Sequence, residues 1–176
     1  MPGAPRGGTA DSLATAVTKV RAAGYAVEYA WEQPRPAALR RLGAIFGSLP
    51  MSVRRIYALG DGMLLRIHHQ EDRSRKIDIV LISAGEALKS AYAGRADIAR
   101  VAGVWCSVRS DGRIEAQNAS GEREEIAPDI ETLFFRVAIN LIRVNDPRYW
   151  LGRRGLLPSE PAAGDASVPF AGSGGR

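Results

Sequence analysis

The chain has 176 residues, of which 45% are apolar and 24% are charged, and its formal net charge is +5. This composition is typical of a globular domain and excludes collagenous, coiled-coil and wholly disordered chains. No stretch of 18 consecutive apolar residues is present, which predicts that no helix spans a membrane and that no membrane is a partner. The single cysteine, Cys106, cannot form an internal disulfide, and residues 1–12 lack the apolar stretch of a signal peptide, so we expect a cytoplasmic location.

The charge is carried mostly by arginine and is unevenly distributed along the chain. Residues 35–76 contain nine basic and three acidic residues, whereas residues 122–131 contain five acidic residues and one basic residue. Two surfaces of opposite charge favour recognition of a protein partner, since nucleic-acid binding calls for one continuous basic stripe.

The two ends of the chain have the composition of disordered tails. Residues 1–9 are rich in Gly, Pro and Ala, and residues 151–176 contain too few large apolar side chains to offset the entropy cost of ordering them. The pattern therefore predicts a single domain over residues 10–150.

The first elements are a helix, a strand and a second helix. A helix over residues 11–23 ends at Gly24, and the alternation of residues 25–31 predicts a strand with its aromatic residues on one face. After a turn at residues 33–36, the helical spacing predicts a second helix whose buried face carries Ala38, Leu39, Leu42, Ile45 and Phe46.

Residues 51–59 decide between two folds. In a strand, the adjacent Arg54 and Arg55 would point to opposite faces, so one guanidinium would enter the core. In a helix capped by Ser52, both arginines face water while Val53, Ile56 and Tyr57 fall together. We therefore expect a helix with these three apolar side chains buried.

The middle of the chain predicts a hairpin followed by a short helix. Residues 63–69 and 76–82 alternate as an antiparallel pair of strands. Ser83 and Glu86 form a capping box that opens a helix reaching Tyr92, and a looser stretch is expected from there to Gly103.

The last part of the domain predicts further strands and a closing helix. Residues 104–109 and 113–117 are expected to pair across a Ser-Asp-Gly turn, and residues 122–126 are a candidate for another strand. Beyond Pro128, a helical spacing without a break joins Ile130, Leu133, Phe134, Val137, Ala138, Leu141 and Ile142. Together these elements predict an α+β fold in which helices pack against a mostly antiparallel sheet.

Residues 36–62 carry short motifs that resemble a known family. They contain a Leu-Pro step at Leu49-Pro50, an aromatic residue at Tyr57 in the following helix, and an Asp-Gly turn at Asp61-Gly62. With the short strand and the Phe- and Leu-rich helix near the end of the domain, residues 32–144 resemble the SUKH superfamily. The resemblance implies an α+β fold and a non-catalytic role, either as an immunity protein that binds a secreted toxin or as a regulatory scaffold.

Candidate catalytic and metal-binding residues are few. His68 and His69 are neighbours in a predicted strand, where they point to opposite faces and do not share a metal. Cys106 shares the apolar face of its strand with Val104 and Val108, which favours packing over nucleophilic chemistry. Because nucleophile-elbow and phosphate-loop motifs are also missing, we expect a protein that is not an enzyme and that uses neither a metal nor a cofactor.

Two charged surfaces are the candidate partner-binding sites. The basic one would form if the second and third helices packed as a hairpin, and it comprises Arg40, Arg41, Arg54 and Arg55. The acidic one comprises Glu122, Glu124 and Glu125. The primary hypothesis is a protein partner, which the resemblance identifies with a toxin domain. A small nucleic-acid-associated protein and a secretion-chaperone-like binder are the alternatives.

Overall fold

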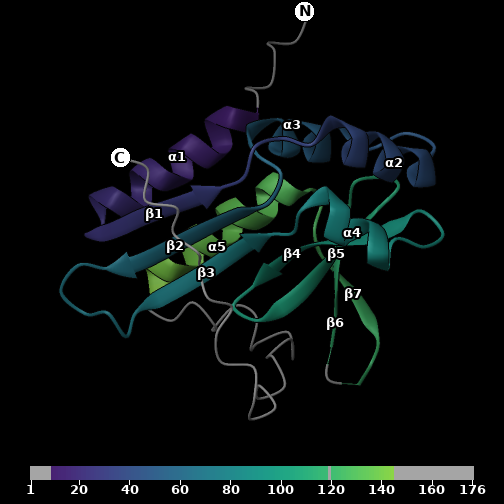
Figure 1. Cartoon of the computed structure of the whole chain (residues 1–176). Coiled ribbons are helices and arrows are strands. Elements are labelled where there is room, and N and C mark those ends of the chain that lie inside the picture. The colour runs from purple at the N-terminus through teal and green to yellow at the C-terminus, as the bar shows by residue number, and fades with distance from the viewer. Residues whose placement is uncertain (1–8, 119, 145–176) are drawn as a thin grey trace, which may run out of the picture.

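The computed structural model describes residues 9–118 and 120–144, which contain five helices and seven strands (Figure 1). In chain order the elements are α1 (Thr9–Ala22), β1 (Tyr25–Trp31), α2 (Pro36–Phe46), α3 (Met51–Leu59), β2 (Met63–His69), β3 (Lys76–Leu81), α4 (Ala84–Ser90), β4 (Arg95–Val101), β5 (Val104–Arg109), β6 (Ile114–Gln117), β7 (Arg123–Ala127) and α5 (Ile130–Val144). The α+β class is therefore confirmed. The predicted tails lie outside the described residues, except for Thr9, which begins α1.

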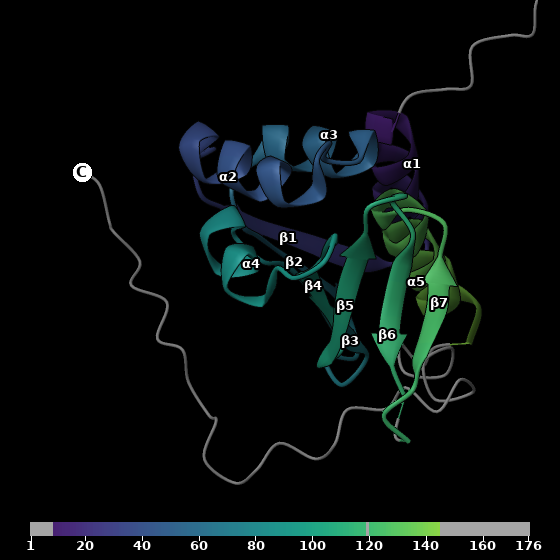
Figure 2. The same cartoon turned by 90° about the vertical axis from the view of Figure 1, so that its right-hand side faces the viewer.

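The strands form one antiparallel sheet whose spatial order follows the chain from β1 to β7. Helices α2 and α3 are inserted between β1 and β2, and α4 is inserted between β3 and β4. The sheet twists so that β5–β7 run across the direction of β1–β3, and α1 and α5 lie on the same side of it (Figures 1 and 2). Helices α2 and α3 lie next to each other above the sheet in both views.

The closing helix α5 is the centre of the core, as its spacing predicts. Leu133, Phe134, Val137 and Leu141 are all buried, and Ile142 is half-buried against the same cluster. Helix α5 also fixes β1, because the Tyr25 hydroxyl donates a hydrogen bond to the Leu141 carbonyl at 3.3 Å.

Helix α3 is confirmed, and Val53, Ile56 and Tyr57 are buried as expected. The predicted cap at Ser52 is wrong. The helix begins at Met51, so the N-cap is Pro50, two residues before Ser52, and its carbonyl accepts the Arg54 backbone N–H at 3.0 Å. The side chain of a residue within the first turn does not reach the helix's free N–H groups in the way that an N-cap side chain does.

Helix α2 is also confirmed, but its buried face is narrower than expected. Leu42 and Phe46 are buried and Leu39 is half-buried, whereas Ile45 is 41% exposed. Ile45 lies about 100° around the helix from Phe46, and α2 is buried along one side only. Its expected burial is therefore wrong.

Strand β4 corrects the expectation of a looser stretch before Gly103. It is an interior strand that pairs with β3 on one side and with β5 on the other. A β-bulge between Asp97 and Ala99 makes consecutive residues, Ile98 and Ala99, point inward, and both are fully buried. The bulge breaks the period of two on which strand recognition depends.

Helix α4 begins with two side-chain caps. The Ser83 hydroxyl accepts the Glu86 N–H at 3.3 Å, as the capping motif predicts, and the buried Asp61 accepts the Ala84 N–H at 2.6 Å. The Glu86 carboxylate binds Lys89 at 2.7 Å instead of completing the capping box. The helix ends at Ser90, earlier than expected.

Candidate functional site

Helices α2 and α3 pack as the hairpin that the sequence analysis considered. Helix α2 starts with Pro36 in its first turn and ends at Gly47, whose φ of +70° is a left-handed conformation that favours glycine. A Cβ added at Gly43 would lie 3.8 Å from the Leu49 Cβ, so the absence of a side chain there leaves room between α2 and the segment that enters α3.

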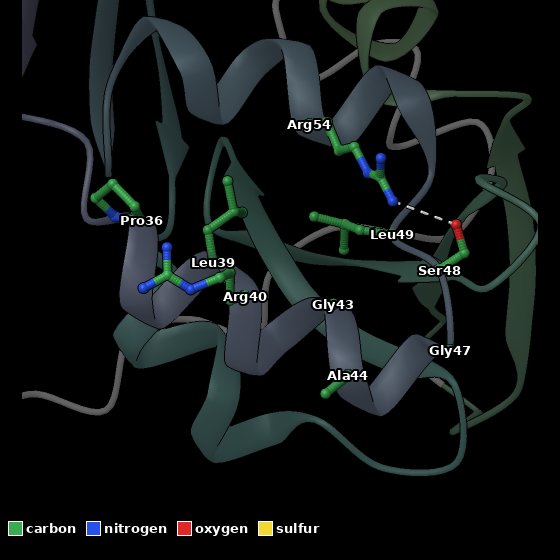
Figure 3. A pocket seen from close by; sticks show the side chains of 9 residues that line it. All are labelled: Pro36, Leu39, Arg40, Gly43, Ala44, Gly47, Ser48, Leu49 and Arg54. Carbon is green, nitrogen blue, oxygen red and sulfur yellow. Dashed lines mark hydrogen bonds between the residues drawn. The ribbon is translucent and has the colours of Figure 1, made fainter.

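A groove of about 420 Å³ lies between these two helices (Figure 3). It is lined by Pro36, Leu39, Arg40, Gly43, Ala44, Gly47, Ser48, Leu49 and Arg54. The lining is mostly apolar; Leu39 comes from α2 and Leu49 from the segment that joins α2 to α3. Arg40 projects from α2 and Arg54 from α3, so the two guanidinium groups lie on opposite walls. None of the lining residues is acidic.

The two arginines of the groove are not neutralised by described carboxylates. Arg54 donates to the Ser48 hydroxyl at 3.3 Å, a neutral partner. Within residues 9–118 and 120–144, neither Arg40 nor Arg54 forms an ion pair with a carboxylate. Because a guanidinium stays charged at any physiological pH, the groove is apolar inside and positively charged at its walls.

The structure places Arg41 and Arg55 outside the groove. Arg41 is exposed on α2 but does not line the cavity. Arg55 faces the start of α5, where its charge lowers the pKa of Glu131. Burial of the Glu131 carboxyl and the neighbouring Asp129 act in the opposite direction and dominate, so the pKa is raised to about 7. Only two of the four predicted arginines therefore share one site.

The predicted acidic surface lies on β7 and on the turn before it. Glu122 accepts a hydrogen bond from the Asn118 side chain at 3.2 Å, and Glu125 binds Arg113 at 2.7 Å. Glu124 is half-buried and also makes a contact of its own. These carboxylates are engaged with neighbouring residues, whereas Arg40 and Arg54 form no ion pair with a described carboxylate. Partner binding at this surface stays a prediction.

An ion-pair network on the sheet was not predicted from the sequence. Glu115 of β6 is only 7% exposed and lies 2.9 Å from Arg95 and 3.2 Å from Arg109. A buried carboxylate is tolerated when charged partners of this kind surround it. Arg95 belongs to β4, which was not predicted as a strand, so its pairing with Glu115 was not predicted either. The alternation of polar and apolar residues at Arg95, Ala96 and Asp97 was the sequence signal for this strand.

The residues considered for catalysis or metal binding are Cys106, His68 and His69, and each packs against neighbouring residues of the fold. Cys106 is fully buried as predicted, and burial raises the pKa of its thiol to about 12, so the thiolate is nearly absent at neutral pH. His68 lies 3.8 Å from Glu28, and the ring of His69 packs edge-on against Tyr25. Among the described residues, no group of three or more His, Cys, Asp or Glu side chains is placed to hold a metal ion.

The structure is thus an α+β domain with a groove between helices α2 and α3, and Arg40 and Arg54 line opposite sides of this groove. In the described part of the chain, no helix combines the length and the apolarity needed to cross a bilayer. No protein-family model matches the sequence, and a search of curated proteins gives no significant match.

Proposed function

We propose that this protein is a non-catalytic binding module of the immunity or regulatory type, and that it holds an acidic segment of a protein partner in the groove between α2 and α3. The supporting observation is the pair of guanidinium groups, Arg40 and Arg54, on opposite walls of an apolar groove without acidic lining residues. Arginine is enriched at protein interfaces and pairs with carboxylates through two parallel hydrogen bonds.

The lining indicates what the partner presents to this groove. Pro36, Leu39 and Ala44 offer apolar surface to an aliphatic or aromatic anchor, and flanking carboxylates of the partner are held by the two guanidinium groups. Charge of this kind contributes most to the rate of encounter and to the choice of partner. The occupant is therefore a short segment that combines an apolar residue with Asp or Glu on both sides.

The motifs that resemble the SUKH superfamily lie around this site. Leu49 lines the groove, Tyr57 anchors α3 by donating a hydrogen bond to the Ile82 carbonyl at 2.6 Å, and Asp61 caps α4. A role as a SUKH-type immunity protein against a secreted toxin, acting in the cytoplasm, is part of the proposal. It rests on these short motifs and on the charge of the groove.

Selection from a displayed library of random short peptides against the full chain tests the proposal. The expected result is enrichment of peptides with an apolar residue flanked by Asp or Glu. Fluorescence anisotropy of one selected peptide then compares the wild type with the double variant Arg40→Glu/Arg54→Glu. We expect the double variant to weaken binding by more than about tenfold. The matched control, Arg41→Glu, changes the charge of the same helix outside the groove and leaves the affinity unchanged.

Three outcomes would contradict the proposal. One is enrichment of peptides without acidic residues, and another is equal affinity of the wild type and the double variant. The third is binding of duplex DNA, with an affinity that falls steeply with salt, in the absence of any selected peptide; this would favour the nucleic-acid alternative. If the peptides selected without Asp or Glu are purely apolar, a chaperone-like binder is favoured instead.

A further inference from the structure

Strand β1 forms one edge of the sheet and lacks the features that usually protect an edge. Within the described residues, β1 pairs only with β2, so its other side has no strand beside it. Its seven residues, Tyr25–Trp31, include neither Lys nor Pro, and Glu28 is their only charged residue. An edge strand of this length without such residues is suited to pairing with another strand.

The hydrogen-bond pattern shows which residues of β1 face outward. The Gly24 carbonyl accepts the Gln70 N–H at 3.1 Å, and the Glu32 N–H donates to the Gly62 carbonyl at 3.2 Å. In an antiparallel ladder, residues alternate between bonding to the partner strand and pointing away from it. The even-numbered residues therefore bond to β2, and the N–H and C=O groups of Val27, Tyr29 and Trp31 point to the open edge.

The same outward residues carry exposed aromatic side chains. Tyr29 is 42% exposed and Trp31 is 60% exposed, and their rings lie 5.9 Å apart. The alternation of the sequence predicts that both share a face with Tyr25, but only the Tyr25 end of the strand is buried. Aromatic side chains on an edge strand can form stabilising cross-strand pairs with the residues of an added strand.

We infer that the outer edge of β1 joins two copies of this chain, through antiparallel pairing of β1 with β1 in which Tyr29 lies opposite Tyr29 of the other copy. In this register Val27 lies opposite Trp31 of the other copy, and each outward pair exchanges two main-chain hydrogen bonds. Glu28 lies opposite an alanine, Ala30. A register centred on Glu28 would instead oppose two carboxylates, which is destabilising.

The opposite edge of the sheet explains why the occupant is β1 of a second copy. Strand β7 is shorter than β1 and carries Arg123, Glu124 and Glu125, so it offers no apolar match for Tyr29 and Trp31. Pairing of β1 with β7 of the next copy would leave one unpaired edge at each end of the assembly, so further copies could add without limit. Pairing of β1 with itself is two-fold symmetric and closes at two chains.

Sedimentation velocity of the full chain over a range of micromolar concentrations tests the inference. We expect a dimer whose dissociation constant rises by at least about tenfold in Tyr29→Pro and in Tyr29→Lys. Proline is compatible with the fold because the Tyr29 N–H points away from β2, and lysine is a typical protector of edge strands. The matched control, Tyr92→Lys, removes an aromatic side chain that is 83% exposed elsewhere and leaves the dimer unchanged.

A cysteine at the centre of the interface tests the register. Directly opposed residues of a hydrogen-bonded antiparallel pair have Cα atoms about 5.5 Å apart, a separation that a disulfide spans. Tyr29→Cys should therefore give a covalent dimer on mild oxidation, whereas Tyr92→Cys should not; the native Cys106 is buried and does not compete. A monomer at every concentration, or a dimer that all three Tyr29 variants leave unchanged, would overturn the inference.

Discussion

Phe134 is the residue on which the core depends most clearly. It is 1% exposed on α5, among the buried apolar residues that the helical spacing of the sequence predicts. Phe134→Ala removes an aromatic ring from a close-packed interior, so we expect the free energy of unfolding to fall by about 3–5 kcal/mol. Denaturant unfolding measures this loss. The neighbouring Phe135 is only half-buried, and Phe135→Ala serves as the control with a smaller expected effect. A loss below about 1 kcal/mol in Phe134→Ala would mean that this side of α5 does not face the core.

Glu131 gives the fold a dependence on pH. Burial and the neighbouring Asp129 raise the pKa of its carboxyl to about 7, and Arg55 offsets this only in part. Between the ordinary pKa of 4.5 and this value the folded state binds more protons than the unfolded state, so stability falls as pH rises through that window. Glu131→Gln removes this contribution. The melting temperature of the variant minus that of the wild type should therefore increase as pH rises from 4.5 to 7. If the difference in melting temperature between variant and wild type stays constant across this pH range, Glu131 is an ordinary exposed carboxylate in the folded protein.

At the scale of single elements, the place of β4 in the sheet predicts slow hydrogen exchange of its amides. It lies in the interior of the sheet, with Ile98 and Ala99 fully buried. Hydrogen exchange of the full chain should show β4 amides that are protected as strongly as those of β3 and β5, because opening β4 requires the sheet to separate. The loop over residues 70–75 is the internal reference for fast exchange. Exchange of β4 as fast as in this loop would contradict its place in the sheet.

The sequence predicts best those elements whose pattern is complete within a single segment. Helix α5 has an unbroken helical spacing, and α3 was predicted because adjacent arginines, Arg54 and Arg55, do not fit a half-buried strand. Strand β4 was missed because its bulge at Asp97–Ala99 destroys the alternation. A bulge is a property of strand pairing, so the segment alone does not reveal it.

The candidate site was predictable only in part, for a similar reason. The sequence indicated basic residues on two neighbouring helices, and the groove brings Arg40 and Arg54 together. Successive residues of a helix lie about 100° apart, so Arg55 faces α5 and Arg41 turns away from the groove. Which member of each pair enters the groove depends on how the two helices pack. That packing depends on residues far away in the sequence, so the local pattern does not reveal it.

At the scale of the whole molecule, ion pairs in the sheet and charges in the groove have different consequences for stability. Arg109 holds the nearly buried Glu115 at 3.2 Å, whereas Arg40 and Arg54 form no ion pair with a described carboxylate. Arg109→Glu should therefore lower the melting temperature clearly, because it sets two carboxylates against each other. Arg40→Glu/Arg54→Glu should change the free energy of unfolding by no more than about 0.5 kcal/mol. A large loss of stability in the double variant would show that the groove arginines support the fold.

The central claim is that the groove between α2 and α3 binds an acidic segment of a partner. The most direct test is a nuclear magnetic resonance titration of the isotope-labelled full chain with an acidic peptide selected on it. We expect saturable shifts concentrated in the amides of residues 36–54, and their loss in Arg40→Glu/Arg54→Glu while Arg41→Glu retains them. Shifts that map to the sheet or to β7, or shifts that the double variant leaves unchanged, would contradict the claim.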